Sequence, residues 1–147
     1  MKAPRAHRIG AVLFGLWGVL HVVGGGALLF AWSSRGSGEL MRSYGSTVAA
    51  DIGDDLPSIV GAVGAFHAFN LLWIGALVLW VAITLNWKNR PEGLWLNVAM
   101  AGAADLGLVL FLLTPGYMTW GEGAPGLALF APAVVFALLG RRASVTP

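Results

Sequence analysis

The 147-residue chain contains no cysteine and few charged residues. Without cysteine it can form no disulfide, no iron–sulfur cluster and no zinc site with thiolate ligands. Charged residues make up 11% of the chain, against about 25% in soluble domains, and hydrophobic residues make up 57%, against about 45–50%. A short soluble domain could not hide this much apolar surface behind nine basic and seven acidic side chains. The composition therefore excludes a globular cytosolic enzyme, a disordered tail and a nucleic-acid-binding module.

The sequence contains four long apolar runs. They cover residues 9–32, 57–85, 94–114 and 125–140. About 20 apolar residues are enough for a helix to cross a bilayer, and none of the runs alternates as the strands of a membrane barrel do. The shorter fourth run contains Pro132, which is tolerated where neighbouring groups satisfy the freed carbonyl. The sequence predicts an all-α polytopic membrane protein, with one domain over 1–147 that forms a four-transmembrane-helix bundle.

The first run follows Lys2, Arg5 and Arg8, so a cleavable signal peptide has to be considered. The apolar part of a signal peptide is about 7–15 residues long and ends at small residues. This run is longer and ends at Phe30, Ala31 and Trp32. We interpret it as a membrane helix that is retained.

Basic residues are concentrated in segments that four crossings place on the same side of the membrane. The N-terminus, the loop 86–93 and the C-terminal tail hold seven of the nine Lys and Arg, and the loop 33–56 holds the other two. By the positive-inside rule, both termini are expected to be cytoplasmic and the loop 33–56 to lie outside. Within that outer loop, Ser37 could begin a short helix through Ala50, and an ordered loop without a helix fits equally well. We expect a multi-pass protein of the cell membrane, and of the inner membrane of a bacterium in particular.

The few polar side chains of the runs lie at a similar depth. His21 is near the middle of the first run, His67 and Asn70 are near the middle of the second, and Asp105 is near the middle of the third. Polar and ionisable side chains are costly at this depth and usually face the bundle interior or a wet cavity. The shared depth predicts that these four side chains meet in one polar pocket.

Two tryptophans are placed by helical spacing beside these polar residues. Trp17 lies one turn before His21, and Trp73 lies one turn after Asn70. We therefore include both indoles in the lining of the pocket. The fourth run offers only small and apolar side chains around this depth and is expected to pack the bundle.

The first functional hypothesis is a pocket that binds or modifies a small lipophilic molecule. Its candidate catalytic residues are His21, His67 and Asp105, because a carboxyl group paired with an imidazole forms a workable acid–base couple. We expect Asp105 to be paired across helices with His21 or His67 in a closed polar pocket at the middle of the membrane. The pattern does not decide between a binding protein and an enzyme.

Two alternatives remain open. In one, His21 and His67 are the axial ligands of a b-type haem held between the first two helices, although their different depths count against it. In the other, the chain is an accessory or assembly subunit whose polar residues only hold helices together. No closely spaced ligand pair such as H-x-x-x-H predicts another metal site. The expected partners are membrane lipids, a homo-oligomer or a larger membrane complex, and not nucleic acid.

Overall fold

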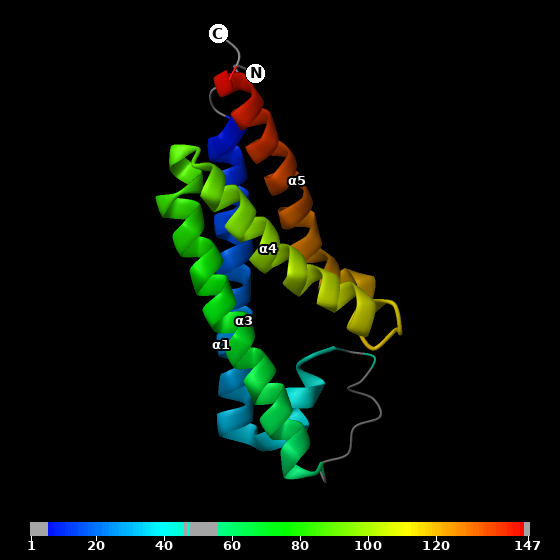
Figure 1. The fold of residues 1–147 in the computed structure, drawn as a ribbon. Coiled ribbons are helices and arrows are strands. Elements are labelled where there is room, and N and C mark those ends of the chain that lie inside the picture. Colours follow the sequence, from blue (N-terminus) through cyan, green and yellow to red (C-terminus); the bar gives the residue numbers. More distant parts are fainter. Residues whose placement is uncertain (1–5, 46, 48–55, 146–147) are drawn as a thin grey trace.

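The computed structural model describes residues 6–45, 47 and 56–145, and within them every regular element is helical (Figure 1). The elements are α1 (Ala6–Arg42), α3 (Ser58–Thr84), the 3₁₀ turn η2 (Asn86–Lys88), α4 (Pro91–Leu108), the π-helical turn η3 (Val109–Leu113) and α5 (Trp120–Val145). The all-α fold with four long helices is confirmed. Three of the helices extend beyond the predicted apolar runs, because helical hydrogen bonding continues into the polar flanks that hydropathy does not mark.

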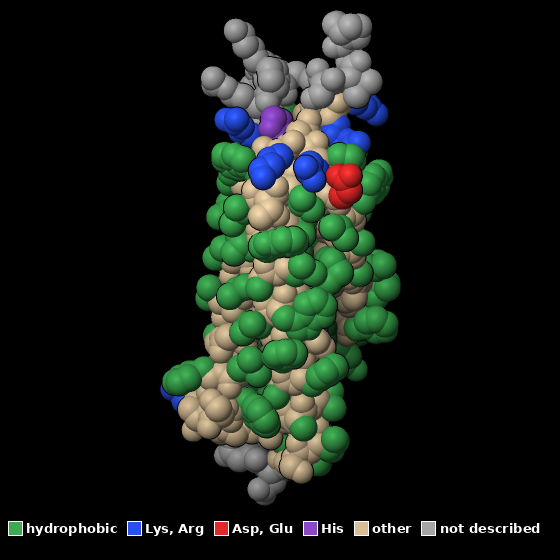
Figure 2. Space-filling view, turned by 60° about the vertical axis from the view of Figure 1, so that its left-hand side comes forward, with side chains coloured by type: hydrophobic (Ala, Val, Ile, Leu, Met, Phe, Trp, Pro, Cys, Tyr) green, Lys and Arg blue, Asp and Glu red, His purple; other side chains and the backbone are tan. Residues whose placement is uncertain are grey.

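In the described part of the chain, four helices are long and apolar enough to cross a membrane: Ala6–Arg42, Ser58–Lys88, Pro91–Leu113 and Trp120–Arg142. Large apolar side chains point outward from them, and Val23, Phe66 and Phe111 are each more than 60% exposed. Figure 2 shows a broad apolar surface, with Lys and Arg gathered at one end. These features are compatible with a multi-pass membrane protein, because a soluble bundle places polar side chains at such positions.

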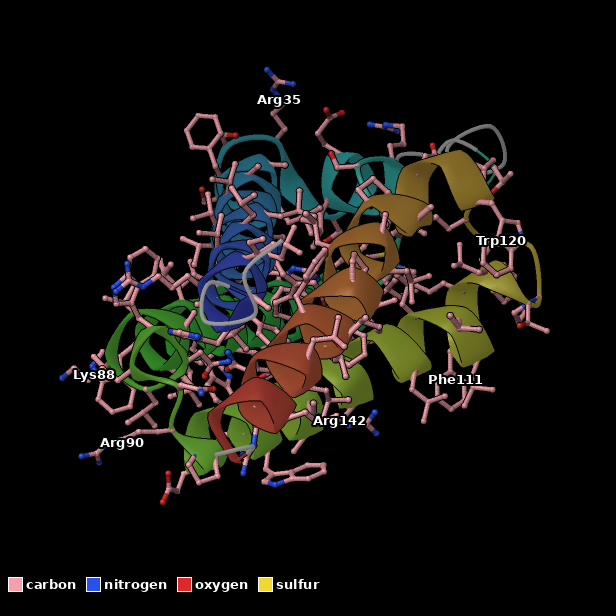
Figure 3. The ribbon with its side chains drawn as sticks, turned by 90° about the horizontal axis from the view of Figure 1, so that it is seen from above. Arg35, Lys88, Arg90, Phe111, Trp120 and Arg142 are labelled. Atoms are coloured by element: carbon pink, nitrogen blue, oxygen red, sulfur yellow. The ribbon has the colours of Figure 1, made fainter. Side chains whose placement is uncertain are left out.

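The helices α1 and α3 form a long antiparallel pair, and α1 also packs against α5, while α4 packs against α3 and α5. Both termini lie at one end, which we call the terminal end (Figure 1). Toward the opposite end, the loop end, η3 and the first turns of α5 stand away from α1 and α3. Figure 3 shows the same divergence along the bundle, with Phe111 and Trp120 on the side away from that pair. The helices of the bundle are therefore less closely associated at the loop end.

Glycines bring the backbones of α1 and α3 into direct contact. A Cβ atom added at Gly75 would lie 2.7 Å from the carbonyl oxygen of Gly18, and one added at Gly25 would lie 2.6 Å from that of Ala68. Small residues at helix interfaces permit this close approach inside membranes. The pair is thus held by backbone contact along this face, with no layer of side chains between the helices.

The last part of α1 turns back at Gly36, whose φ of 82° lies in the left-handed region that favours glycine. After this kink, Ser37 packs against Gly61, and Leu40 packs against Gly64 of α3. The expected helix after Ser37 is therefore present as far as Arg42. The rest of its expected length, through Ala50, includes residues 46 and 48–50, which lie outside the described residues.

Candidate functional site

The site is centred on two fully buried side chains, Trp17 of α1 and Asp105 of α4. The indole Nε1 of Trp17 donates to both oxygens of Asp105, at 3.2 Å to Oδ1 and 3.3 Å to Oδ2. Since α1 packs mainly on α3 and α5, this hydrogen bond reaches across the bundle. A carboxylate accepts at about four positions, and a single indole N–H supplies only part of that capacity.

His21 lies one helical turn beyond Trp17 and stacks on its indole, with ring centroids 3.6 Å apart. Its Nδ1 is 2.8 Å from the carbonyl oxygen of Trp17. Because a carbonyl oxygen only accepts, we assign the proton of the neutral imidazole to Nδ1. The lone pair of Nε2 then remains able to accept a hydrogen bond or a proton.

Gly126 of α5 brings a third helix to the same point. A Cβ atom added there would lie 3.2 Å from Asp105 Oδ1, 3.4 Å from His21 Cε1 and 3.5 Å from Trp17 Nε1. Because Gly126 has no side chain, α5 can approach all three groups this closely. We call Trp17, His21, Asp105 and Gly126 the central cluster.

Sequence reasoning missed Gly126, because we expected the fourth helix only to pack the bundle. The predicted run began at residue 125, which places Gly126 near the helix end. The helix actually begins at Trp120, so Gly126 lies in its second turn. A glycine has no polar group to mark it, and a correct helix start was the only signal that could have placed it at the site.

The direct Asp105–imidazole pair expected from the sequence is not present in the described residues. The indole of Trp17 supplies the donor to Asp105, while Nδ1 of His21 is taken up by a backbone carbonyl. The contact between the two ionisable groups therefore runs through Trp17. Depth along a helix predicted that the groups are neighbours but could not predict which atoms bond.

The other three predicted residues lie outside the central cluster. His67 is exposed, and its ring is 5.7 Å from that of Tyr44, which follows α1 in the chain. Asn70 Oδ1 accepts from Trp73 Nε1 at 2.9 Å, within α3 itself. This bond joins two residues of one helix, and no hydrogen bond of the described residues links Asn70 or Trp73 to the central cluster.

The haem alternative does not fit the contact between α1 and α3. A Cβ atom added at Gly75 would lie 2.8 Å from the backbone nitrogen of Val22 and 2.9 Å from His21 Cβ. The two helices touch at the level of His21, so a porphyrin has no room between them there. In the described residues, no group of three or more His, Asp or Glu side chains could hold a metal ion.

No protein-family model, curated protein or solved structure matches this chain.

Proposed function

We propose that the chain is an integral membrane protein whose central cluster binds, or binds and modifies, a small lipophilic molecule that carries a hydrogen-bond donor. The observation that carries this proposal is the buried and only partly satisfied carboxylate of Asp105, beside which α5 places no side chain at Gly126. A hydroxyl or amino group placed there could donate to Asp105. Nε2 of His21 is a second acceptor close by.

Aromatic rings of the packed core lie one turn away from the central cluster. Phe14 precedes Trp17 on α1, and Phe130 follows Gly126 on α5; their ring centroids are 6.2 Å apart, in an edge-to-face arrangement. Small-molecule sites commonly combine apolar walls with a few polar groups that fix orientation. The surroundings of the central cluster have this composition.

The central cluster lies at the edge of the packed core, where a membrane-dissolved molecule could reach it. Trp17 and Asp105 are buried, whereas His21 is half-buried and His67 is exposed. This change in burial accompanies the divergence of α4 and α5 from α1 and α3 (Figure 1). We propose that the ligand approaches from the loop end.

The same groups could carry a proton-transfer step. Nε2 of neutral His21 can accept a proton, and a carboxyl group near it can hold one, which are the roles that general acid–base catalysis requires. A bound molecule would have to place its reacting proton within hydrogen-bonding reach of Nε2. The proposal requires binding and allows this chemistry.

For the orientation, we propose that the terminal end faces the cytoplasm of a bacterial cell. Five basic side chains of the described residues belong to the elements and the connection at this end, namely Arg8, Lys88, Arg90, Arg141 and Arg142. Basic residues flanking membrane helices are retained on the cytoplasmic side. The central cluster would then be reached from the outer half of the membrane.

The experiment is mass spectrometry of an organic extract from the protein purified in mild detergent. We expect a compound that is enriched with the wild type and lost from Asp105→Leu. Asn70→Leu is the matched control, because it removes a polar group of the membrane interior that is satisfied within α3. It should retain the compound. No enriched compound in the wild type, or equal loss from both variants, would contradict the proposal and leave the Trp17–Asp105 bond as a link between helices.

A visible spectrum of the same preparation, oxidised and reduced, tests the haem alternative separately. We expect no Soret band, because the contact between α1 and α3 leaves no room for a porphyrin at His21. A Soret band that depends on both His21 and His67 would contradict this account of the site.

A further inference from the structure

A second polar site lies at the terminal end, far from the central cluster along the helices. It is a small open cavity: its enclosed part, about 10 Å³, has room for one water-sized group, and together with its open mouth the empty space is about 200 Å³. Its lining comes from α1, η2, the connection to α4, α4 itself and α5, and consists of His7, Asn86, Asn89, Arg90, Leu94, Ala137 and Arg141. Polar side chains surround it, and Leu94 and Ala137 form its apolar part.

Buried polar atoms without a partner are gathered around this cavity. Among the described residues, four of the five buried side-chain atoms that make no hydrogen bond belong to the lining: His7 Nδ1, Asn86 Nδ2, Asn86 Oδ1 and Arg141 Nη1. The fifth, Asn97 Oδ1, lies elsewhere on α4. Asn86 as a whole is only 4% exposed. Folded proteins leave few such atoms unsatisfied, and each needs an explanation. Their concentration around one cavity indicates a shared partner from outside the chain.

The charge of the lining indicates the sign of that partner. Arg141 has a buried, unpaired donor, and Arg90 is exposed in the same lining. No acidic side chain of the described residues lines the cavity. An uncompensated guanidinium nitrogen is costly to bury, so the cavity favours an anion.

The shape of the donor set narrows the class of anion. A guanidinium group matches the oxygens of a phosphate group, to which it donates in a forked geometry. Asn86 adds one donor, Nδ2, and one acceptor, Oδ1, to the same space. The acceptor calls for an O–H on the ligand, which hydrogen phosphate has and which a phosphodiester with a hydroxylated headgroup also has. Basic pockets between membrane helices are known to bind such headgroups.

We propose that this cavity binds a phosphate group at its mouth, with one phosphate oxygen in the enclosed part beside Arg141 and Asn86 and with Arg90 on the outer side. The phosphate is that of a hydroxylated anionic lipid or of free hydrogen phosphate. Binding ties the start of α1 to the end of α5 and to the connection between α3 and α4. The site is independent of the central cluster.

The test measures thermal unfolding of the full chain in neutral detergent, with two probes. One arm adds sodium phosphate against sodium chloride of equal ionic strength, and the other adds phosphatidylglycerol against phosphatidylcholine. A ligand that binds only the folded protein raises the unfolding temperature, which yields an apparent affinity. A response to phosphate alone assigns the site to the free ion, and a response to phosphatidylglycerol alone assigns it to the lipid headgroup. A response to both probes shows that the site recognises the phosphate group itself.

The variants separate a built site from general attraction to a basic end. Arg141→Gln should weaken binding about tenfold, as expected for loss of a hydrogen bond to a charged group. Arg142→Gln removes the same charge from the neighbouring residue, which does not line the cavity, and should leave the affinity within about twofold. If Arg141→Gln fails to fold, Arg90→Gln takes its place, because Arg90 is exposed at the mouth of the cavity and its loss should also weaken phosphate binding. Equal weakening by Arg141→Gln and Arg142→Gln, or no response to either probe, would overturn the proposal.

Discussion

The indole nitrogen of Trp17 lies 3.2 Å from Oδ1 and 3.3 Å from Oδ2 of Asp105, so one N–H group serves both oxygens of a buried carboxyl group. The bond joins α1 to α4, although each of these helices packs mainly on α3 or α5. Little water is available in the membrane interior to replace it. The pair is therefore a link across the bundle and also the polar centre on which the proposed binding depends.

Substitutions of Asp105 should separate the hydrogen bond from the rest of the side chain. Asp105→Leu leaves the indole N–H of Trp17 without an acceptor and should destabilise the fold by roughly 1–3 kcal/mol. Asp105→Asn keeps an acceptor oxygen and should cost less. Reversible unfolding in mixed micelles measures both free energies.

A double-mutant cycle with Trp17→Phe checks that the effect belongs to this pair. The double variant Trp17→Phe/Asp105→Leu should cost less than the sum of the two single variants, because neither partner is then left unsatisfied. Strictly additive costs, together with equal effects of Asp105→Asn and Asp105→Leu, would contradict a hydrogen bond between these residues.

The contact between α1 and α3 predicts opposite outcomes for two glycine substitutions. Gly75→Ala places a Cβ atom 2.7 Å from the carbonyl oxygen of Gly18, and the backbones must separate to admit it. We expect a loss of about 1–3 kcal/mol in unfolding free energy. Gly24→Ala is the control, since no atom lies within 4 Å of its Cβ position, and it should be neutral or slightly stabilising. If both variants unfold at the same temperature, the described helix contact is incorrect.

Hydropathy was sufficient to predict the four helices, because the apolar surface that a membrane requires is long and continuous in this chain. Depth along the helices also predicted that His21 and Asp105 are neighbours, and both do lie beside Gly126. Depth does not specify rotation about a helix axis. Asn70 therefore faces its own helix partner, Trp73, although it was expected in the same pocket.

The rest could not be read from the sequence for physical reasons. The neighbour of His67 is Tyr44, which belongs to the polar segment after α1 and is brought there by the turn at Gly36. Hydropathy carries no information about such a return. Asp105 finds its donor in Trp17, and an indole in an apolar run reads as packing unless its N–H is assigned a partner.

Tyr44 should titrate at an unusually high pH. Burial raises its pKa to about 12, and its hydroxyl donates to the carbonyl oxygen of Gly64 at 2.6 Å. Because the folded state favours the protonated phenol, this contribution to stability is complete below pH 10, the ordinary pKa, and is lost as the pH rises toward 12. Tyr117→Phe leaves Tyr44 as the one tyrosine of the chain, so its ultraviolet titration can be followed alone. A midpoint near 10 in the folded protein would show that Tyr44 is not buried.

The proposed orientation is testable because the chain has no cysteine of its own. Ser43→Cys, at the loop end, should react with a membrane-impermeant maleimide on intact cells. Glu92→Cys, at the terminal end, should react only after the cells are opened. Both positions are exposed, and neither substitution changes the number of basic residues. The reverse labelling pattern would place the terminal end outside.

The most direct test of the central claim adds a methyl group beside Asp105 without removing any polar group. Gly126→Ala puts a methyl group 3.2 Å from Asp105 Oδ1, whereas Gly107→Ala, on α4, puts one where no atom lies within 4 Å. The measurement is the amount of lipophilic compound that co-purifies with each variant, per amount of protein. The variants compared must have the same unfolding temperature. The account predicts at least a tenfold reduction with Gly126→Ala and wild-type amounts with Gly107→Ala. Wild-type amounts with both variants would contradict binding at the central cluster.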